Sequence, residues 1–130
     1  QKIFFDGQIY DAFSLLVKLV SGAKESIILI DNYVNVGTLN ILAKKKANVS
    51  VCVYTMRQTK LTAGDVKNFN KQYPSLELKY TDAFHDRFLI VDDGCSYHIG
   101  ASLKDAGKKC FAINRLEDVQ IVKDILRQLI

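Results

Sequence analysis

The sequence has few cysteines and no long apolar segment. Its three cysteines, Cys52, Cys95 and Cys110, are an odd number without a C-x-x-C pair, and this spacing excludes a disulfide framework and a zinc knuckle. We expect small, mostly buried thiols in a reducing cytoplasm. The longest apolar runs, such as residues 27–30, are too short to span a bilayer, which excludes a transmembrane protein.

Several catalytic and targeting signatures are also absent. The chain has no Walker loop, zinc-binding triad, G-x-S-x-G elbow or carboxylate cluster for paired magnesium, so we expect neither a metal nor another cofactor. A signal peptide is not visible, which favours a cytoplasmic location. Because the chain begins with Gln1 rather than Met, we expect it to be a fragment of a longer protein.

The composition is that of one folded domain. The chain has 130 residues, of which 48% are hydrophobic and 25% charged, and this balance is sufficient for a buried core. Eighteen Lys and Arg residues against 14 Asp and Glu give a net charge of +4. A mildly basic chain favours a phosphate-bearing partner. No internal repeat or linker interrupts residues 1–130, so we expect a single domain.

Hydrophobic periodicity predicts alternating strands and helices, followed by clustered strands. Strands are expected at residues 2–5, 26–30, 49–54, 76–80, 87–91, 96–99 and 110–113. Helices are expected from residue 10 to the stop at Gly22, at residues 39–46, from a capping box at Thr62 to Pro74, and at residues 119–129. This order predicts an α/β fold, with a mixed sheet sandwiched between helices.

The only two histidines, His85 and His98, are candidates for a titratable catalytic group. If residues 85–92 are extended, the His85 and Arg87 side chains project from the same face, because side chains alternate along a strand. An imidazole beside a fixed cation suits phosphate chemistry. The structural alternative is a histidine that caps a strand, with Arg87 and Asp92 as surface charges. For His98 we expect a packed or hydrogen-bonded strand residue.

Two further groups of polar residues are candidates for ligand contact. Asp31 and Asn32 follow a buried strand, where open α/β sheets usually meet their ligands, although a turn or capping role fits equally well. Lys104, Lys108 and Lys109 follow the histidine segment. A lysine cluster is usually solvated surface, but beside a phosphate site it attracts a nucleic-acid backbone.

The segment His85-x-Arg87-x-x-x-x-Asp92 resembles the H-x-K-x-x-x-x-D motif of the phospholipase D superfamily, with Arg in the Lys position. The next strand ends in Gly-Ala-Ser-Leu-Lys at residues 100–104, which is similar to the G-S-x-N element that follows that motif. The order of elements also fits the family along nearly the whole chain. The resemblance is strongest to single-motif bacterial members of the Nuc endonuclease type, and similar domains follow DNA-binding domains in phage-type and bacterial proteins.

The resemblance implies a metal-independent phosphodiesterase. In this family the motif histidine attacks phosphorus and forms a phosphohistidine, while the histidine of a second motif protonates the leaving group. Carried over, His85 is the nucleophile, Arg87 the phosphate clamp and Asp92 a supporting acid, and Ser102 holds a phosphate oxygen or orders its loop. Because the chain has one motif, the resemblance implies a homodimer in which two histidines face each other.

Departures from the family pattern leave two functions open. The Asn of G-S-x-N is absent, and no acid lies between Asp105 and Glu117, where Nuc-type members place a Glu that orients the histidine. An imidazole without this partner loses control of its tautomer. The first hypothesis is a nuclease that acts through His85, and the alternative is a catalytically degenerate DNA-binding or dimerisation module. In both, the expected partner is nucleic acid, DNA before other phosphodiesters.

Overall fold

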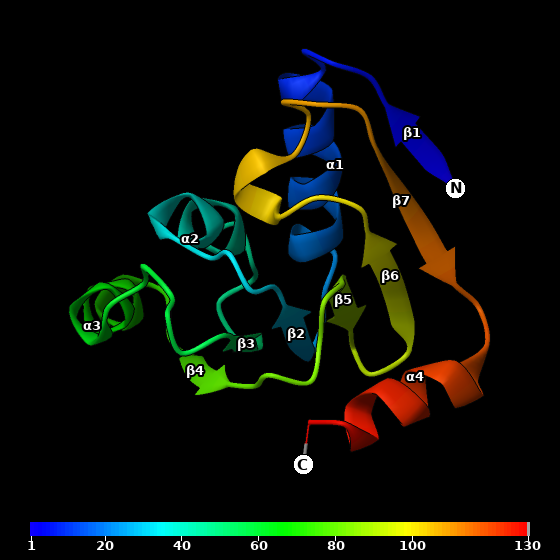
Figure 1. Ribbon diagram of the computed structural model, residues 1–130. Coiled ribbons are helices and arrows are strands. Elements are labelled where there is room, and N and C mark those ends of the chain that lie inside the picture. Colours follow the sequence, from blue (N-terminus) through cyan, green and yellow to red (C-terminus); the bar gives the residue numbers. More distant parts are fainter. Residues whose placement is uncertain (130) are drawn as a thin grey trace.

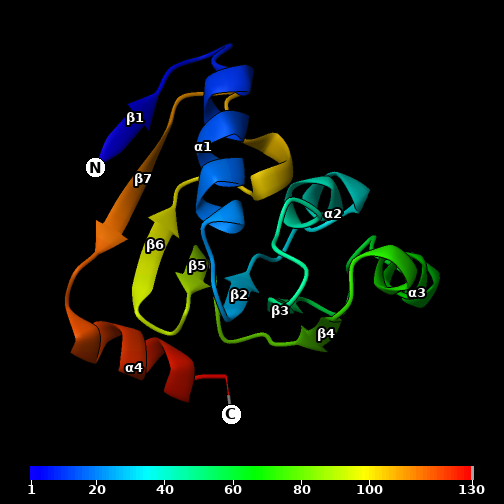
Figure 2. The same ribbon diagram turned by 180° about the vertical axis from the view of Figure 1, so that it is seen from behind.

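A seven-stranded mixed sheet organises the protein, of which the computed structural model describes residues 1–129. The strand order is β1-β7-β6-β5-β2-β3-β4, with β1 and β4 at the two margins (Figure 2). The parallel strands are β2 (Ser26–Ile30), β3 (Ser50–Thr55) and β4 (Leu76–Tyr80). The antiparallel strands are β1 (Lys2–Phe4), β5 (Arg87–Val91), β6 (Cys95–Ile99) and β7 (Phe111–Leu116).

Helices cover the two faces of the sheet unequally. On one face lie α1 (Ile9–Ser21), α2 (Val36–Leu42) and α3 (Ala63–Gln72), whereas α4 (Val119–Arg127) lies alone on the other (Figure 1). The alternation along β2 reflects this arrangement, because Ile27 and Leu29 pack with the three-helix layer and Ile30 packs with Val122 and Ile125 of α4. The expected α/β class, with a mixed sheet between helices, is confirmed.

Local signals predicted most of the elements. The strands β2, β4 and β5 have the predicted bounds, and the capping box at Thr62 forms through reciprocal bonds with Asp65 of 3.0 and 3.1 Å. The helix predicted at residues 39–46 was misplaced, since α2 is Val36–Leu42. Its start is set by Asn35, whose side chain accepts a hydrogen bond from the Gly37 N–H at 2.8 Å.

The expectation of mostly buried thiols was wrong. Cys52 and Cys95 are partly exposed and Cys110 is exposed; all three are free. Cys110 lies in a surface loop, between the single-turn helix η1 (Leu103–Asp105) and β7. No helix within residues 1–129 has both the length and the apolar character needed to cross a membrane.

A buried carboxylate joins the end of β2 to the segment that follows β6. Asp31 has no exposed surface, and its oxygens accept three hydrogen bonds, from the Tyr33 N–H at 3.0 Å and from the Ser102 hydroxyl and the Leu103 N–H at 2.9 Å each. A buried carboxylate is tolerated only where donors of this kind satisfy it. Of the two roles considered for Asp31, the structure gives it the turn-forming one, and η1 is held over the end of β2.

A second carboxylate fixes the opposite end of β2. Asp92 lies in the β5–β6 turn, where Asp92 and Asp93 have φ values of 55° and 56°, a region that Asp tolerates better than most residues. The Asp92 carboxylate accepts hydrogen bonds from the backbone N–H groups of Lys24, Glu25 and Ser26, the shortest being 2.7 Å from Glu25. These bonds, chiefly that of Glu25, lower the pKa of Asp92 below its ordinary value.

Replacement of Asp31 by Asn should destabilise the domain strongly. The substitution removes the charge and one acceptor oxygen from a buried site with three donors, so we expect the free energy of unfolding to fall by about 3 kcal/mol in urea denaturation. Ser102→Ala removes one donor only and should cost about 1 kcal/mol. Equal losses in the two variants would contradict the role given to Asp31.

Asp92→Asn should lower the melting temperature at neutral pH and reduce its acid sensitivity. The folded-state pKa of Asp92 is depressed, so its stabilising contribution is present above the unfolded-state pKa of about 4 and is lost as the pH falls below that value and through the folded-state pKa. Calorimetry across this range should show a smaller acid-side decline in the variant than in the wild type. The matched control is Asp93→Asn at the exposed neighbouring position, which should leave the profile unchanged.

Candidate functional site

The topology collects many polar loops at one end of the sheet. The parallel strands β2, β3 and β4 finish there, β5 and β7 begin there, and β6 ends beside the start of β5 through the pair Arg87 and Ile99. We call this the carboxyl end of the sheet. It is the end at which ligands meet open α/β sheets, and it carries most of the predicted phosphate-binding residues.

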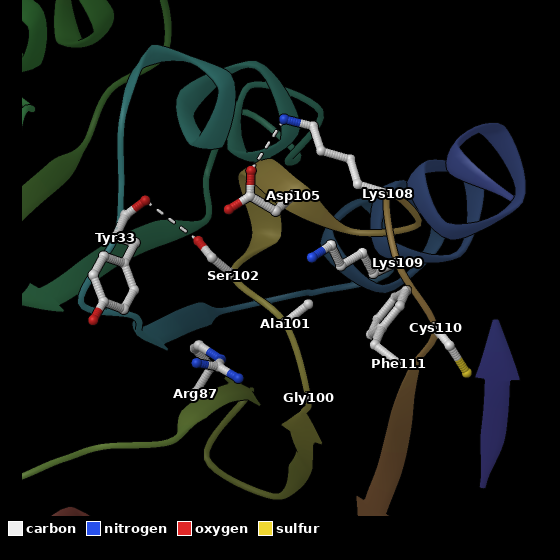
Figure 3. A pocket seen from close by; sticks show the side chains of 10 residues that line it. All are labelled: Tyr33, Arg87, Gly100, Ala101, Ser102, Asp105, Lys108, Lys109, Cys110 and Phe111. Atoms are coloured by element: carbon white, nitrogen blue, oxygen red, sulfur yellow. Dashed lines mark hydrogen bonds and ion pairs between the residues drawn. The ribbon is translucent and has the colours of Figure 1, made fainter. Parts of the chain in front are cut away.

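A cavity of about 460 Å³ opens at this end. Arg87 at the start of β5, together with Lys108 and Lys109 of the loop before β7, supplies three cationic side chains to its wall (Figure 3). Asp105 is the one carboxylate among its lining residues. The other walls are Tyr33, Gly100, Ala101, Ser102, Cys110 and Phe111. Positive charge therefore prevails, so the cavity suits an anion.

Two of the predicted phosphate ligands are already engaged within the protein. The Arg87 Nε donates to the Ile99 carbonyl oxygen at 3.2 Å, which fixes the guanidinium and leaves its two terminal nitrogens for an anion. Ser102 is buried, and its hydroxyl oxygen lies 2.9 Å from Asp31 Oδ2 and 3.3 Å from the Tyr33 carbonyl oxygen, both of which are acceptors for its proton. Ser102 therefore orders its loop, one of the two roles considered for it.

The three predicted lysines line two different hollows. Lys108 and Lys109 line the Arg87 cavity, whereas Lys104 lines the neighbouring hollow. Asp105 accepts hydrogen bonds from Lys104 at 2.5 Å and from Lys108 at 3.1 Å. These contacts, chiefly that of Lys104, lower the pKa of Asp105. Asp105 thus neutralises part of the lysine charge and holds the Lys108 side chain against η1.

His85 is not brought into the Arg87 cavity. It lies in a bend before β5, which begins at Arg87. The alternation of side chains along a strand, which would have placed His85 on the same face as Arg87, therefore does not extend to His85. His85 lines a separate hollow of about 430 Å³, next to Phe84, Phe88 and residues of α4. Asp92 lies at the far end of β5 from Arg87. The catalytic roles predicted for His85, Arg87 and Asp92 stay predictions.

His98 is a packed strand residue. It lies opposite Phe88 in the β5–β6 pair, with the two ring centres 5.6 Å apart. Its Nε2 lies 3.5 Å from a carboxylate oxygen of Asp86. Among residues 1–129 no group of three or more His, Cys, Asp or Glu side chains is arranged to hold a metal ion.

Sequence reasoning missed Tyr33, Lys60 and Arg57 at the carboxyl end of the sheet. Tyr33 lines both the Arg87 cavity and the adjacent hollow, which Lys60 also lines, and Arg57 lies in a third hollow beyond. The available signal was positional. Each of these residues follows a parallel strand by two to five positions, where loops of α/β sheets carry ligand-binding side chains.

Comparison with known proteins supports the fold. No family model and no curated protein sequence matches the chain. Among solved structures, NucT from Helicobacter pylori superimposes with a TM-score of 0.71 at 11% identity, covering 98% of this chain and 94% of that one. Nuc from Salmonella typhimurium, a phospholipase D family member, gives 0.69 at 18% identity, covering 97% and 88%.

A third neighbour extends the comparison beyond these two proteins. TrmBL2, an archaeal chromatin protein whose structure shows a novel mode of DNA binding, gives a TM-score of 0.61 at 17% identity. The match covers 98% of this chain but 47% of TrmBL2. The fold implied by the motif resemblance is confirmed: this chain has the phospholipase D-like fold.

Proposed function

We propose that this domain binds the phosphodiester backbone of nucleic acid, with DNA as the expected form, in the Arg87 cavity and does not cleave it. The observation that carries the proposal is that Arg87, Lys108 and Lys109 line one cavity and His85 lines another. Cations gathered in a cavity attract phosphate through charge and through release of counterions.

The geometry of Arg87 supports recognition of phosphate in particular. Its Nε is tied to the Ile99 carbonyl, so the guanidinium loses little further freedom when its two terminal nitrogens bind two oxygens of one phosphate. Lys108 and Lys109 approach from the opposite loop as point charges (Figure 3). The site thus combines one oriented guanidinium, that of Arg87, with the two flexible ammonium groups of Lys108 and Lys109.

The surroundings of His85 support binding without turnover. A nucleophilic or proton-donating histidine needs a partner that orients its ring. Among residues 1–129 no carboxylate is paired with His85, and the adjacent Asp86 faces His98. An imidazole that is neither oriented nor placed in the phosphate cavity contributes little to attack on phosphorus.

The second candidate function is metal-independent hydrolysis through a phosphohistidine at His85. It is favoured by the fold shared with Nuc and by the spacing of His85, Arg87 and Asp92. Because the chain carries one motif, this function requires a homodimer that brings two copies of His85 to one phosphate. The fold itself fits either function. It occurs in Nuc, a phospholipase D family member, and in TrmBL2, an archaeal chromatin protein whose structure shows a novel mode of DNA binding.

Arg87→Ala should weaken DNA binding by about tenfold, because a charge-assisted clamp is lost. Fluorescence anisotropy with a labelled oligonucleotide should also show that the slope of log affinity against log salt becomes shallower by about one. Arg87→Lys keeps the charge but loses the bond to Ile99, and we expect intermediate affinity. Arg127→Ala on α4 makes the same charge change outside the cavity and is the matched control. An unchanged affinity for Arg87→Ala would contradict the proposal.

The purified domain should not hydrolyse single-stranded or double-stranded DNA, with or without EDTA, because His85 lies outside the phosphate cavity. Gel analysis of an end-labelled substrate measures this directly. Cleavage that resists EDTA and disappears in His85→Ala would establish the hydrolase and reject binding without turnover. Light scattering should then detect the dimer that the reaction requires.

A further inference from the structure

Three hollows lie in a row along the carboxyl end of the sheet and share wall residues. The Arg87 cavity shares Tyr33 with a hollow of about 170 Å³. That hollow shares Met56 and Gln58 with a third, of about 290 Å³, beside the end of β4. Adjacent hollows therefore border one another, and the row of three follows the order β7, β6, β5, β2, β3, β4. We call this row the strand-end groove.

Cations occur along the whole strand-end groove. The Arg87 cavity has three, the middle hollow has Lys60 and Lys104, and the third hollow has Arg57. The carboxylates that line the groove are Asp82 and Asp105, and Asp105 is already paired with two lysines. Because neighbouring strands are about 4.8 Å apart, five strand intervals from β7 to β4 extend over about 24 Å. This length fits several consecutive phosphates rather than one.

Two exposed tyrosines line the strand-end groove. Tyr33, which is 53% exposed, stands between the first two hollows, and Tyr80, which is 46% exposed, lines the third. The Arg57 guanidinium lies over the Tyr80 ring, 5.2 Å from its centre. Aromatic rings and guanidinium planes stack on nucleobases. The faces of bases are open to such stacking in a single strand and closed in a duplex.

Asn32, one of the residues that line the middle hollow, has an unpaired buried acceptor. The Asn32 side-chain NH₂ donates to the Phe84 carbonyl at 2.8 Å, and its Oδ1 is buried without a donor from residues 1–129. Buried acceptors in native proteins are nearly always paired. The atom is enclosed by the protein, so it marks a locally unsatisfied part of the hollow's wall and is not itself a contact for the ligand.

We propose that the strand-end groove binds single-stranded nucleic acid, with successive phosphates on the cations from Lys109 to Arg57 and with bases stacked on Tyr33 and Tyr80. The proposal rests on the proposed function, because it takes the Arg87 cavity as one phosphate subsite. It adds the strand preference and a set of contacts beyond that cavity. The site size is about four nucleotides, at the short end for single-strand modules.

The test compares one labelled DNA oligonucleotide, alone and annealed to its complement, by fluorescence anisotropy at fixed salt. We expect the single strand to bind at least tenfold more tightly than the duplex. Tyr33→Leu and Tyr80→Leu should each lower single-strand affinity by about tenfold through loss of stacking. Tyr33→Phe retains the stacking ring and should bind more tightly than Tyr33→Leu. Lys60→Ala should weaken binding and flatten its salt dependence.

Two controls separate stacking from folding and from general charge. Tyr10→Leu changes a tyrosine that is 78% exposed on α1, and Lys123→Ala removes a charge on α4; neither should alter affinity. Circular dichroism melts verify that each variant is folded. Equal binding of duplex and single strand would overturn the proposed single-strand groove and leave the proposed function intact. The same conclusion would follow if the folded Tyr33→Leu and Lys60→Ala variants kept their affinity while Arg87→Ala bound weakly. Absence of binding to either probe would overturn both.

Discussion

The hydrogen-bonded carboxylate of Asp31 is the constraint on which the carboxyl end of the sheet depends. It has no exposed surface and no cation bonded to it among residues 1–129, so its charge is tolerated only while its donors stay in place. Two of these donors come from residues 102 and 103, about seventy positions away in sequence. The carboxylate therefore positions η1, and with it the lysine loop that faces Arg87.

The topology of the sheet also has an electrostatic consequence. Parallel strands β2, β3 and β4 deliver three loops to the same end of the sheet, and the antiparallel hairpin of β5 and β6 adds Arg87 and the Ser102 segment. The cations on these loops are dispersed in sequence and adjacent in space. Their proximity costs repulsion, which Asp105 reduces by pairing with Lys104 and Lys108. The unpaired remainder is available for an anionic ligand.

Sequence patterns predicted the elements better than the site. Strands such as β2 and β5 were found because continuous apolar runs signal burial on both faces. The site depended on distant contacts that no local pattern contains, such as the anchoring of Ser102 by Asp31. The expected placement of His85 beside Arg87 required residues 85–92 to be extended, whereas His85 lies in a bend before β5, which begins at Arg87 as predicted. The separation of Lys104 from Lys108 and Lys109 follows from the turn of η1, which propensity did not predict.

Binding and cleavage place different demands on this end of the sheet. Binding needs cations that converge on one surface. Each contact with a phosphate releases counterions and so adds to the affinity, and the cation need not be strictly oriented. Cleavage needs an oriented imidazole close to a phosphorus atom held by Arg87. Arg87 belongs to the hydrogen-bonded ladder and is further fixed by Ile99, whereas His85 lies outside the ladder. The fold thus fixes Arg87 independently of His85, so the proposed binding of phosphate does not depend on where His85 lies.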